Sequence, residues 1–256
     1  MPIFGPYRAW LERLPAGRLP RCEDLNALTG QSILTAGGAL LRFVEPDHAA
    51  EAYELRVLRS GEVMTRPDNW HDVFNALAWM TFPRTKALLN ARHCDEIRSR
   101  GITGARGTVR DVLSLFDEGG AIVASSDAHL LDLIRRFDWK TLFWERRNEV
   151  MERMRFFVFG HALLEAALDP YKGATAKALL LDVAPSFMAL ACAEQLSEVD
   201  ERTAAWFARP EATRSTRTLS PLPIMGIPGW ADNGSAAFYD DTRVFRPGYS
   251  RASVDG

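Results

Sequence analysis

The chain has 256 residues, of which 47% are hydrophobic and 25% are charged, so it can bury a large core without disulfide bonds to staple it. Its formal net charge of -2 argues against a protein that coats nucleic acid or anionic membranes through bulk charge. The three cysteines form no CxxC pair, which excludes a zinc ribbon or a dithiol redox motif. With no apolar run of about 18 residues, we expect a cytoplasmic protein without membrane association.

We expect a single domain over residues 1–256, with three parts. Residues 1–35 carry scattered prolines and glycines and predict an irregular N-terminal arm with two short helices. Residues 36–209 predict the core. Residues 210–256 are rich in proline and glycine but also hold large apolar side chains, which disordered tails lack. They therefore predict an ordered segment that wraps over the domain, with fraying at its end.

The first half of the core opens with predicted strands. Residues 39–44 are mostly apolar and stop at a proline. Residues 53–58 alternate polar and apolar side chains, which is the period of a half-buried strand. Residues 63–65 follow a turn that contains a glycine, so together these segments predict a small antiparallel hairpin.

Residues 70–81 have the apolar spacing of a helix, and Asp68 or Asn69 is a suitable N-cap for it. Pro83 should end this helix, because proline lacks the backbone N–H and clashes with the preceding turn. The same proline can begin a second helix over residues 84–98.

Residues 109–116 and 121–124 are rich in β-formers and flank Asp117-Glu118-Gly119-Gly120, which predicts another hairpin. Turn chemistry explains these two carboxylates without any reaction. The remaining predictions, in order, are a helix capped by residues 125–127, a helix over 139–154, a short strand or helix entry at 155–159, a helix over 160–168, a strand over 177–184 and a helix from Ser186 to about residue 208. Helices and strands mix without regular alternation, so we expect an α+β fold, mostly helical with short antiparallel hairpins.

Polar residues form a stripe along the two helices around the proline. His71 and Asn75 are four residues apart and share a face, and the stripe continues through Lys86 and Asn90 to His93. A straight helix would separate His71 from His93 by about 33 Å. They can therefore serve one site only if the chain turns back at the intervening proline.

A second pair of polar groups lies on the predicted helix over residues 160–168. His161 and Glu165 are four residues apart, a spacing at which two side chains can hold one metal ion. The alternative is that both groups only satisfy hydrogen bonds inside a mostly apolar helix. If the metal interpretation holds, His71, Asp72, His161 and Glu165 together would form one divalent-metal site.

The segment over residues 84–110 is the clearest electrostatic feature, with seven arginines and lysines against two acidic residues. The planar guanidinium fork of arginine suits phosphate groups. The alternative is a solvated helix face with no partner.

Three blocks of sequence stand out: residues 69–93 with Asn69-Trp70-His71-Asp72 and Phe82-Pro83-Arg84-Thr85-Lys86, then Phe159-Gly160-His161-Ala162-Leu163-Leu164-Glu165, then Pro221-Leu222-Pro223-Ile224-Met225-Gly226-Ile227-Pro228-Gly229-Trp230. They resemble an uncharacterised bacterial family, domain of unknown function 3025, over roughly residues 40–248. The resemblance implies a bacterial protein and supplies no activity, cofactor or fold.

The adjacent pair His71-Asp72 is also similar to the His-Asp pair of metal-dependent phosphohydrolases. That resemblance implies an upstream histidine, for which His48 is the candidate, and a downstream aspartate on a separate helix.

Our first hypothesis is a cytoplasmic hydrolase-like protein, working with or without a divalent metal, that acts on a phosphate-bearing substrate. Its metal ligands or acid–base groups would be His71, Asp72, His161 and Glu165, and Asn75 would be a further catalytic residue. Its substrate-binding groups would be Arg84, Lys86, Asn90 and His93. The second hypothesis is a non-catalytic module that binds nucleic acid or an acidic partner through residues 84–110. The sequence leaves open whether the protein is an enzyme.

Overall fold

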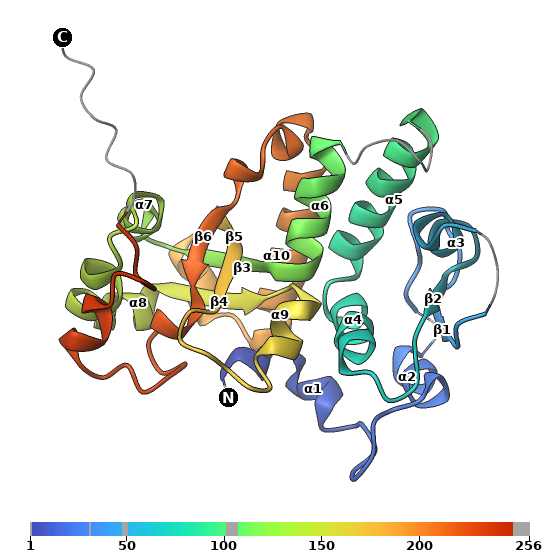
Figure 1. Ribbon diagram of the computed structural model, residues 1–256, viewed down its shortest axis with the longest axis horizontal. Coiled ribbons are helices and arrows are strands. Elements are labelled where there is room, and N and C mark those ends of the chain that lie inside the picture. The colour runs from blue at the N-terminus through green and yellow to red at the C-terminus, as the bar shows by residue number, and fades with distance from the viewer. Residues whose placement is uncertain (1, 31, 48–50, 101–106, 248–256) are drawn as a thin grey trace.

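The computed structural model describes residues 2–30, 32–47, 51–100 and 107–247, and it has the expected α+β architecture (Figure 1). The helices and strands, in chain order, are α1 (Arg8–Leu11), α2 (Cys22–Thr29), β1 (Arg42–Val44), α3 (Tyr53–Ser60), β2 (Glu62–Met64), α4 (Trp70–Thr81), α5 (Pro83–Arg100), α6 (Thr108–Gly119), β3 (Gly120–Ser125), α7 (Ala128–Arg136), α8 (Arg147–Arg153), β4 (Met154–Val158), α9 (His161–Ala166), β5 (Thr175–Asp182), α10 (Cys192–Phe207) and β6 (Ser220–Pro223). A π-helix, Thr141–Glu145, precedes α8, and short 3-10 turns complete the set.

A mixed sheet forms one side of the core, with the strand order β4-β3-β5-β6. Strand β3 pairs antiparallel with β4 and parallel with β5, and every residue of β3 is buried. The small and apolar residues of β3 suit a central strand covered on both faces. Strand β6 contains Pro221 and Pro223, which lack a backbone donor and are tolerated because β6 lies at the edge.

The helices α4, α5 and α6 form the other side of the core, next to α3 and the two-stranded sheet of β1 and β2 (Figure 1). The side chain of Asn69 accepts a hydrogen bond from the backbone of Asp72, which caps α4 as predicted. Helix α5 begins at Pro83, and α4 packs against α5. The chain therefore turns back at this proline, as a joint site requires.

Two segments predicted as strands, residues 53–58 and 109–116, are helices in the structure. The segment at residues 53–58 is α3, which ends at Gly61 with a left-handed φ of 73°. A Cβ at Gly61 would lie 2.0 Å from the backbone oxygen of Leu40, so only glycine fits. Because α3 crosses between them, β1 and β2 pair in parallel rather than as an antiparallel hairpin.

The predicted hairpin around Asp117-Glu118-Gly119-Gly120 is also wrong. Residues 109–116 belong to α6, which buries Val112, Leu113 and Phe116 on one face. Asp117 and Glu118 are the last turn of that helix, and the strand β3 begins directly after it. The helix expected from Ser186 begins later, at Cys192, after a 3-10 turn over Pro185–Ala189.

The described part of the C-terminal segment, up to residue 247, packs against the domain. Tyr239 and Phe245 are buried, and the hydroxyl of Tyr239 donates to the backbone oxygen of Gly226 at 2.9 Å. The expected fraying at the end of the chain falls outside the described residues. Within the described residues, every helix is too short or too polar to span a bilayer.

Candidate functional site

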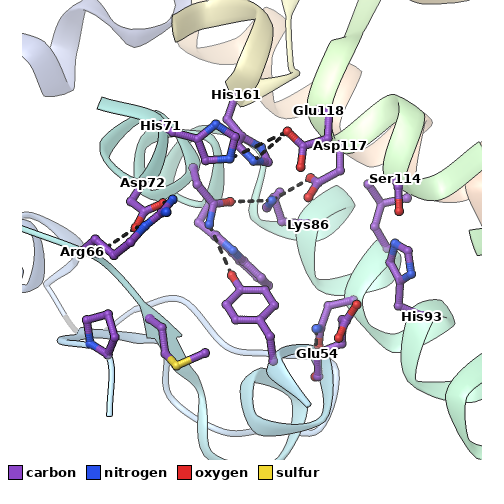
Figure 2. Close-up of a pocket in the computed structure, with 17 residues that line it drawn as sticks. Glu54, Arg66, His71, Asp72, Lys86, His93, Ser114, Asp117, Glu118 and His161 are labelled. Carbon is purple, nitrogen blue, oxygen red and sulfur yellow. Dashed lines mark hydrogen bonds and ion pairs between the residues drawn. The ribbon is translucent and has the colours of Figure 1, made fainter. Parts of the chain in front are cut away.

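A pocket of about 420 Å³ lies between α3, α4, α5, α6 and the start of α9 (Figure 2). Its wall includes His71 from α4, Lys86 from α5, Glu118 from α6 and His161 from α9. Figure 2 shows His71, His161 and Glu118 gathered at one end and His93 farther along the wall. Elements that are distant in the sequence therefore build one cavity.

The two histidines converge on one carboxylate. Nε2 of His71 lies 3.8 Å from Oε2 of Glu118, and Nε2 of His161 lies 3.3 Å from the same oxygen. One ligand atom from each residue lies within 4.8 Å of the others. A tetrahedral zinc ion with bonds of about 2.0–2.2 Å holds its ligand atoms about 3.3–3.6 Å apart. Small side-chain movements would bring all three atoms onto one ion.

Glu165 contacts the ring nitrogen of His71 that points away from Glu118. Its Oε2 lies 3.1 Å from Nδ1 of His71, and since a carboxylate can only accept, Nδ1–H donates a hydrogen bond to it. Nε2 of His71 then carries the lone pair and faces Glu118. Metal-binding histidines commonly donate their second ring nitrogen to a carboxylate in this way. Glu165 is therefore an orienting group for His71 rather than a fourth direct ligand.

Gly160 allows α9 to begin directly against the end of α6. A Cβ on Gly160 would lie 2.4 Å from the backbone oxygen of Glu118 and 2.5 Å from the backbone nitrogen of Gly120. The backbone N–H groups of Phe159 and Gly160 both donate to the oxygen of Gly120 at 2.9 Å. This close approach places His161 beside Glu118.

The pocket shifts the pKa values of the groups around the two histidines. Burial lowers the pKa of His161 to about 4, despite the opposing effect of Asp117, so the ring is neutral at pH 7. Burial, together with the charge of Asp117, raises the pKa of Glu118. Burial alone would also raise the pKa of Asp117, but Lys86 and His161 outweigh it, and the net shift is downward. Asp117 is therefore ionised at neutral pH.

A buried network lies beside the histidines. Lys86 is only 4% exposed, and its Nζ donates to Oδ1 of Asp117 at 2.6 Å and to Oδ1 of Asn75 at 2.8 Å. Nδ2 of Asn75 donates to the hydroxyl of Tyr53 at 3.2 Å. The ammonium also lies 5.5 Å from the ring centroid of Trp79. Asn75 and Lys86 thus line the pocket but are held by other protein groups.

Asp72 does not join the metal-binding group, contrary to expectation. Its Oδ2 accepts hydrogen bonds from the backbone N–H of Arg66 at 2.7 Å and from Nε of Arg66 at 2.8 Å, while Oδ1 accepts from Nη2 at 2.8 Å. This fork-like pairing satisfies the carboxylate and ties the loop before α4 to the helix. His48, the upstream histidine of the phosphohydrolase resemblance, lies outside the described residues.

Arg84 also lies away from the pocket. Its backbone N–H and that of Thr85 donate to the carboxylate of Asp200 on α10, at 3.0 and 2.9 Å. Its guanidinium lies 3.5 Å from the hydroxyl of Ser197. Arg84 therefore helps to join α5 to α10, and Lys86 and Arg84 do not form one anion site.

Several arginines in the described part of the arginine-rich segment are already bound to other residues of the chain. Arg92 donates to the backbone oxygen of Phe207 and to the hydroxyl of Thr213. Arg110 lies 3.6 Å from a carboxylate oxygen of Glu54. Part of the segment lies outside the described residues, and its role in binding nucleic acid or an acidic partner stays a prediction.

Asn90 and His93 line the pocket on the same face of α5 as Lys86, as the stripe predicted. Nδ2 of Asn90 donates to the backbone oxygen of Glu54 at 3.0 Å. Burial is the main cause of the lowered pKa of His93. The charges of Asp117 and Glu54 oppose it, and those of Arg110 and Lys86 add to it, so the net shift is downward. The His93 ring is thus neutral at pH 7.

Glu118 was assigned to a turn by the sequence analysis and was therefore not predicted as a site residue. The apolar residues Val109, Val112, Leu113 and Phe116 follow the spacing of a helix, and this signal extends the helix to Glu118. The two glycines that follow Glu118 are as compatible with the end of a helix as with a hairpin turn.

The fold and the pocket define an α+β protein with a potential metal-binding group of two histidines and a glutamate. Residues 41–249 match the family described as "Protein of unknown function (DUF3025)", and the chain belongs to this family. The family resemblance of the three sequence blocks is thereby confirmed. No curated protein and no solved structure matches the chain.

Proposed function

We propose that this protein is a divalent-metal-dependent hydrolase, with His71, His161 and Glu118 as the metal ligands. The observation that carries the proposal is the convergence of two Nε2 atoms on the Glu118 carboxylate, at 3.8 and 3.3 Å, in the wall of a pocket. Two histidines and one glutamate form a common ligand set of catalytic zinc sites, which leave a fourth position for water. A bound ion would lower the pKa of that water and make it a nucleophile near neutral pH.

Residues of the chain hold both histidines in a state that can bind metal even without an ion present. His161 is held neutral by burial, and His71 is held in the Nε2-ligand tautomer by Glu165. The two histidines come from α4 and α9, which pack against each other. Ligands on rigid helices are positioned more accurately than ligands on loops.

A phosphate-bearing substrate is part of the proposal. Two neutral imidazoles, one carboxylate and a divalent ion would together carry a charge of about +1, which attracts an anionic oxygen. The side chain of Arg66 lines the same pocket and is 57% exposed, although it is paired with Asp72. Lys86 is instead enclosed by Asp117 and Asn75. We therefore place the phosphate between the metal ligands and Arg66.

Metal binding is the first test. Purified protein would be stripped with a chelator and titrated calorimetrically with Zn²⁺ and Mn²⁺, and hydrolysis of bis(p-nitrophenyl) phosphate would be followed with each ion. We expect about one ion per chain and metal-dependent turnover, both lost in His161→Gln. The matched control is His129→Gln, because His129 is exposed on α7 and lies outside the pocket.

The outcomes separate the two parts of the proposal. A wild-type protein that binds neither ion at micromolar concentration would refute the metal site. A protein that binds metal but cleaves neither phosphate esters nor p-nitrophenyl acetate would refute the hydrolase. Cleavage of the acetate alone would refute the phosphate-bearing substrate.

A further inference from the structure

Outside the metal-binding group, the pocket is lined by residues with buried polar atoms that have no partner among the described residues. They are Nε1 of Trp79, Oδ1 of Asn90 and Nδ1 of His93. All three residues line the pocket, and their exposed fractions are 2%, 7% and 8%. Figure 2 shows the His93 ring on the Ser114 side of the pocket, away from His71.

Such atoms are costly if they stay unpaired. Burying an amide or ring nitrogen without a hydrogen bond is unfavourable, and buried polar groups nearly always have a partner. The neighbouring groups are satisfied: Nδ2 of Asn90 donates to the backbone of Glu54, and Tyr53 accepts from Asn75. The bond to Glu54 also fixes the Asn90 amide, so its Oδ1 is held ready to accept.

This end of the pocket is electrically neutral. The Glu54 carboxylate pairs with Arg110 at 3.6 Å, and the His93 ring is neutral. Apolar side chains, including Leu89 and Met64, line other parts of the pocket. An ionised group would find no free counter-charge among these described neighbours, whereas an uncharged ring with a few polar edges would find an acceptor, an imidazole nitrogen and an indole N–H.

We propose that Trp79, Asn90 and His93 form a subsite for an uncharged heterocyclic ring that carries a donor beside an acceptor, as a nucleobase does. Tyr53 and Trp79 both line the pocket, and aromatic side chains pack favourably against flat rings. A sugar is disfavoured, because it carries a hydroxyl on most carbons and would leave several of them unpaired against apolar wall.

The subsite defines a substrate class for the proposed hydrolase. It depends on that proposal only for the position of the reacting phosphate group. Lys86 neighbours the metal-binding group through its bond to Asp117, and His93 lies seven residues farther along α5, which is about 10 Å. A nucleotide bound along α5 would place its phosphate near the metal ligands and its base near His93.

The test uses the full chain, stripped of metal, so that it does not depend on the metal site. Adenosine, guanosine, cytidine and uridine would be titrated calorimetrically, with glucose and inorganic phosphate as comparison probes. We expect at least one nucleoside to bind with a 1:1 ratio and glucose to show no heat of binding. Asn90→Leu and His93→Phe should each weaken that binding about tenfold, since each removes one hydrogen-bonding atom.

Two controls make the test specific. His129→Phe changes an exposed histidine outside the pocket and should leave nucleoside binding unchanged. Zn²⁺ titration of Asn90→Leu should give the wild-type affinity, because Asn90 is not a metal ligand. Nucleosides that all fail to bind while Zn²⁺ binds would overturn the subsite and leave the proposed hydrolase standing. Nucleoside binding by a protein that binds no metal would support the subsite and refute the proposed metal-dependent hydrolase.

If either pocket variant fails to fold, judged by circular dichroism, crystals of the wild-type protein soaked with the tightest nucleoside would decide. A base within hydrogen-bonding distance of Asn90 and His93 supports the subsite. A base bound elsewhere, or no bound nucleoside, overturns it.

Discussion

The imidazole rings of His71 and His161 meet edge to face, with their centroids 4.4 Å apart and their planes at 77°. One ring comes from α4 and the other from α9, so tertiary packing alone creates the pair. In this orientation both Nε2 atoms face the Glu118 carboxylate. The three side chains therefore lie close enough together for one ligand atom of each to contact a shared ion.

Glu165 should control metal affinity without being a ligand. In Glu165→Gln the Nδ1 proton of His71 loses its charged acceptor, and we expect Zn²⁺ affinity to fall by about 10–100-fold in calorimetric titration. Glu201→Gln, on the exposed face of α10, is the matched control and should bind as wild type. Wild-type affinity in Glu165→Gln would show that His71 is not oriented by this contact.

The sequence predicted the parts of the fold that depend on local signals. The cap at Asn69 and the break at Pro83 act within a few residues, and both are confirmed. The errors at α3 and α6 have one cause: short segments of β-forming residues fit either period, and packing decides between them. Burial of Val112 and Phe116 on one face of α6 is such a tertiary outcome.

The site was predictable only in part, for a related reason. The i, i+4 spacing of His161 and Glu165 pointed to α9, and the expected meeting of His71 with His161 occurs. Glu118 was hidden because its place depends on the pairing of β3 with β4, which brings the end of α6 to the start of α9. Asp72 was misassigned because its partner, Arg66, is a loop residue whose position has no local signal.

Gly160 should be intolerant of any side chain. In Gly160→Ala the new Cβ would lie 2.4 Å from the Glu118 backbone oxygen, so α6 and α9 must separate. We expect a loss of about 1–3 kcal/mol in the free energy of unfolding, measured by urea denaturation, together with weaker Zn²⁺ binding. Gly119→Ala is the matched control, because a Cβ there meets nothing within 4 Å. Equal stability of the two variants would contradict the close approach.

Lys86 should be essential for the stability of the pocket wall. Lys86→Met leaves the Asp117 carboxylate without its ammonium partner, and we expect a loss of about 3 kcal/mol in the free energy of unfolding. This is the lower end for a broken buried pair, because the Asp117 side chain is 26% exposed. The double variant Lys86→Met, Asp117→Asn should recover part of the loss. A double variant that is less stable than Lys86→Met would show that the unpaired charge is not the cause.

His93 should make the metal-free protein less stable as the pH falls. Its pKa is lowered in the folded protein, whereas an unfolded chain has a histidine pKa of about 6.5. Below that value the unfolded chain binds a proton that the folded chain does not, so the free energy of unfolding decreases as the pH falls from 7 toward the folded pKa. Urea denaturation at pH 7 and pH 5, with chelator present, should show a smaller decrease for His93→Gln than for wild type. His129→Gln, which changes an exposed histidine, should follow the wild type. An identical decrease in His93→Gln and wild type would mean that the His93 ring takes up its proton as readily in the folded chain as in the unfolded one.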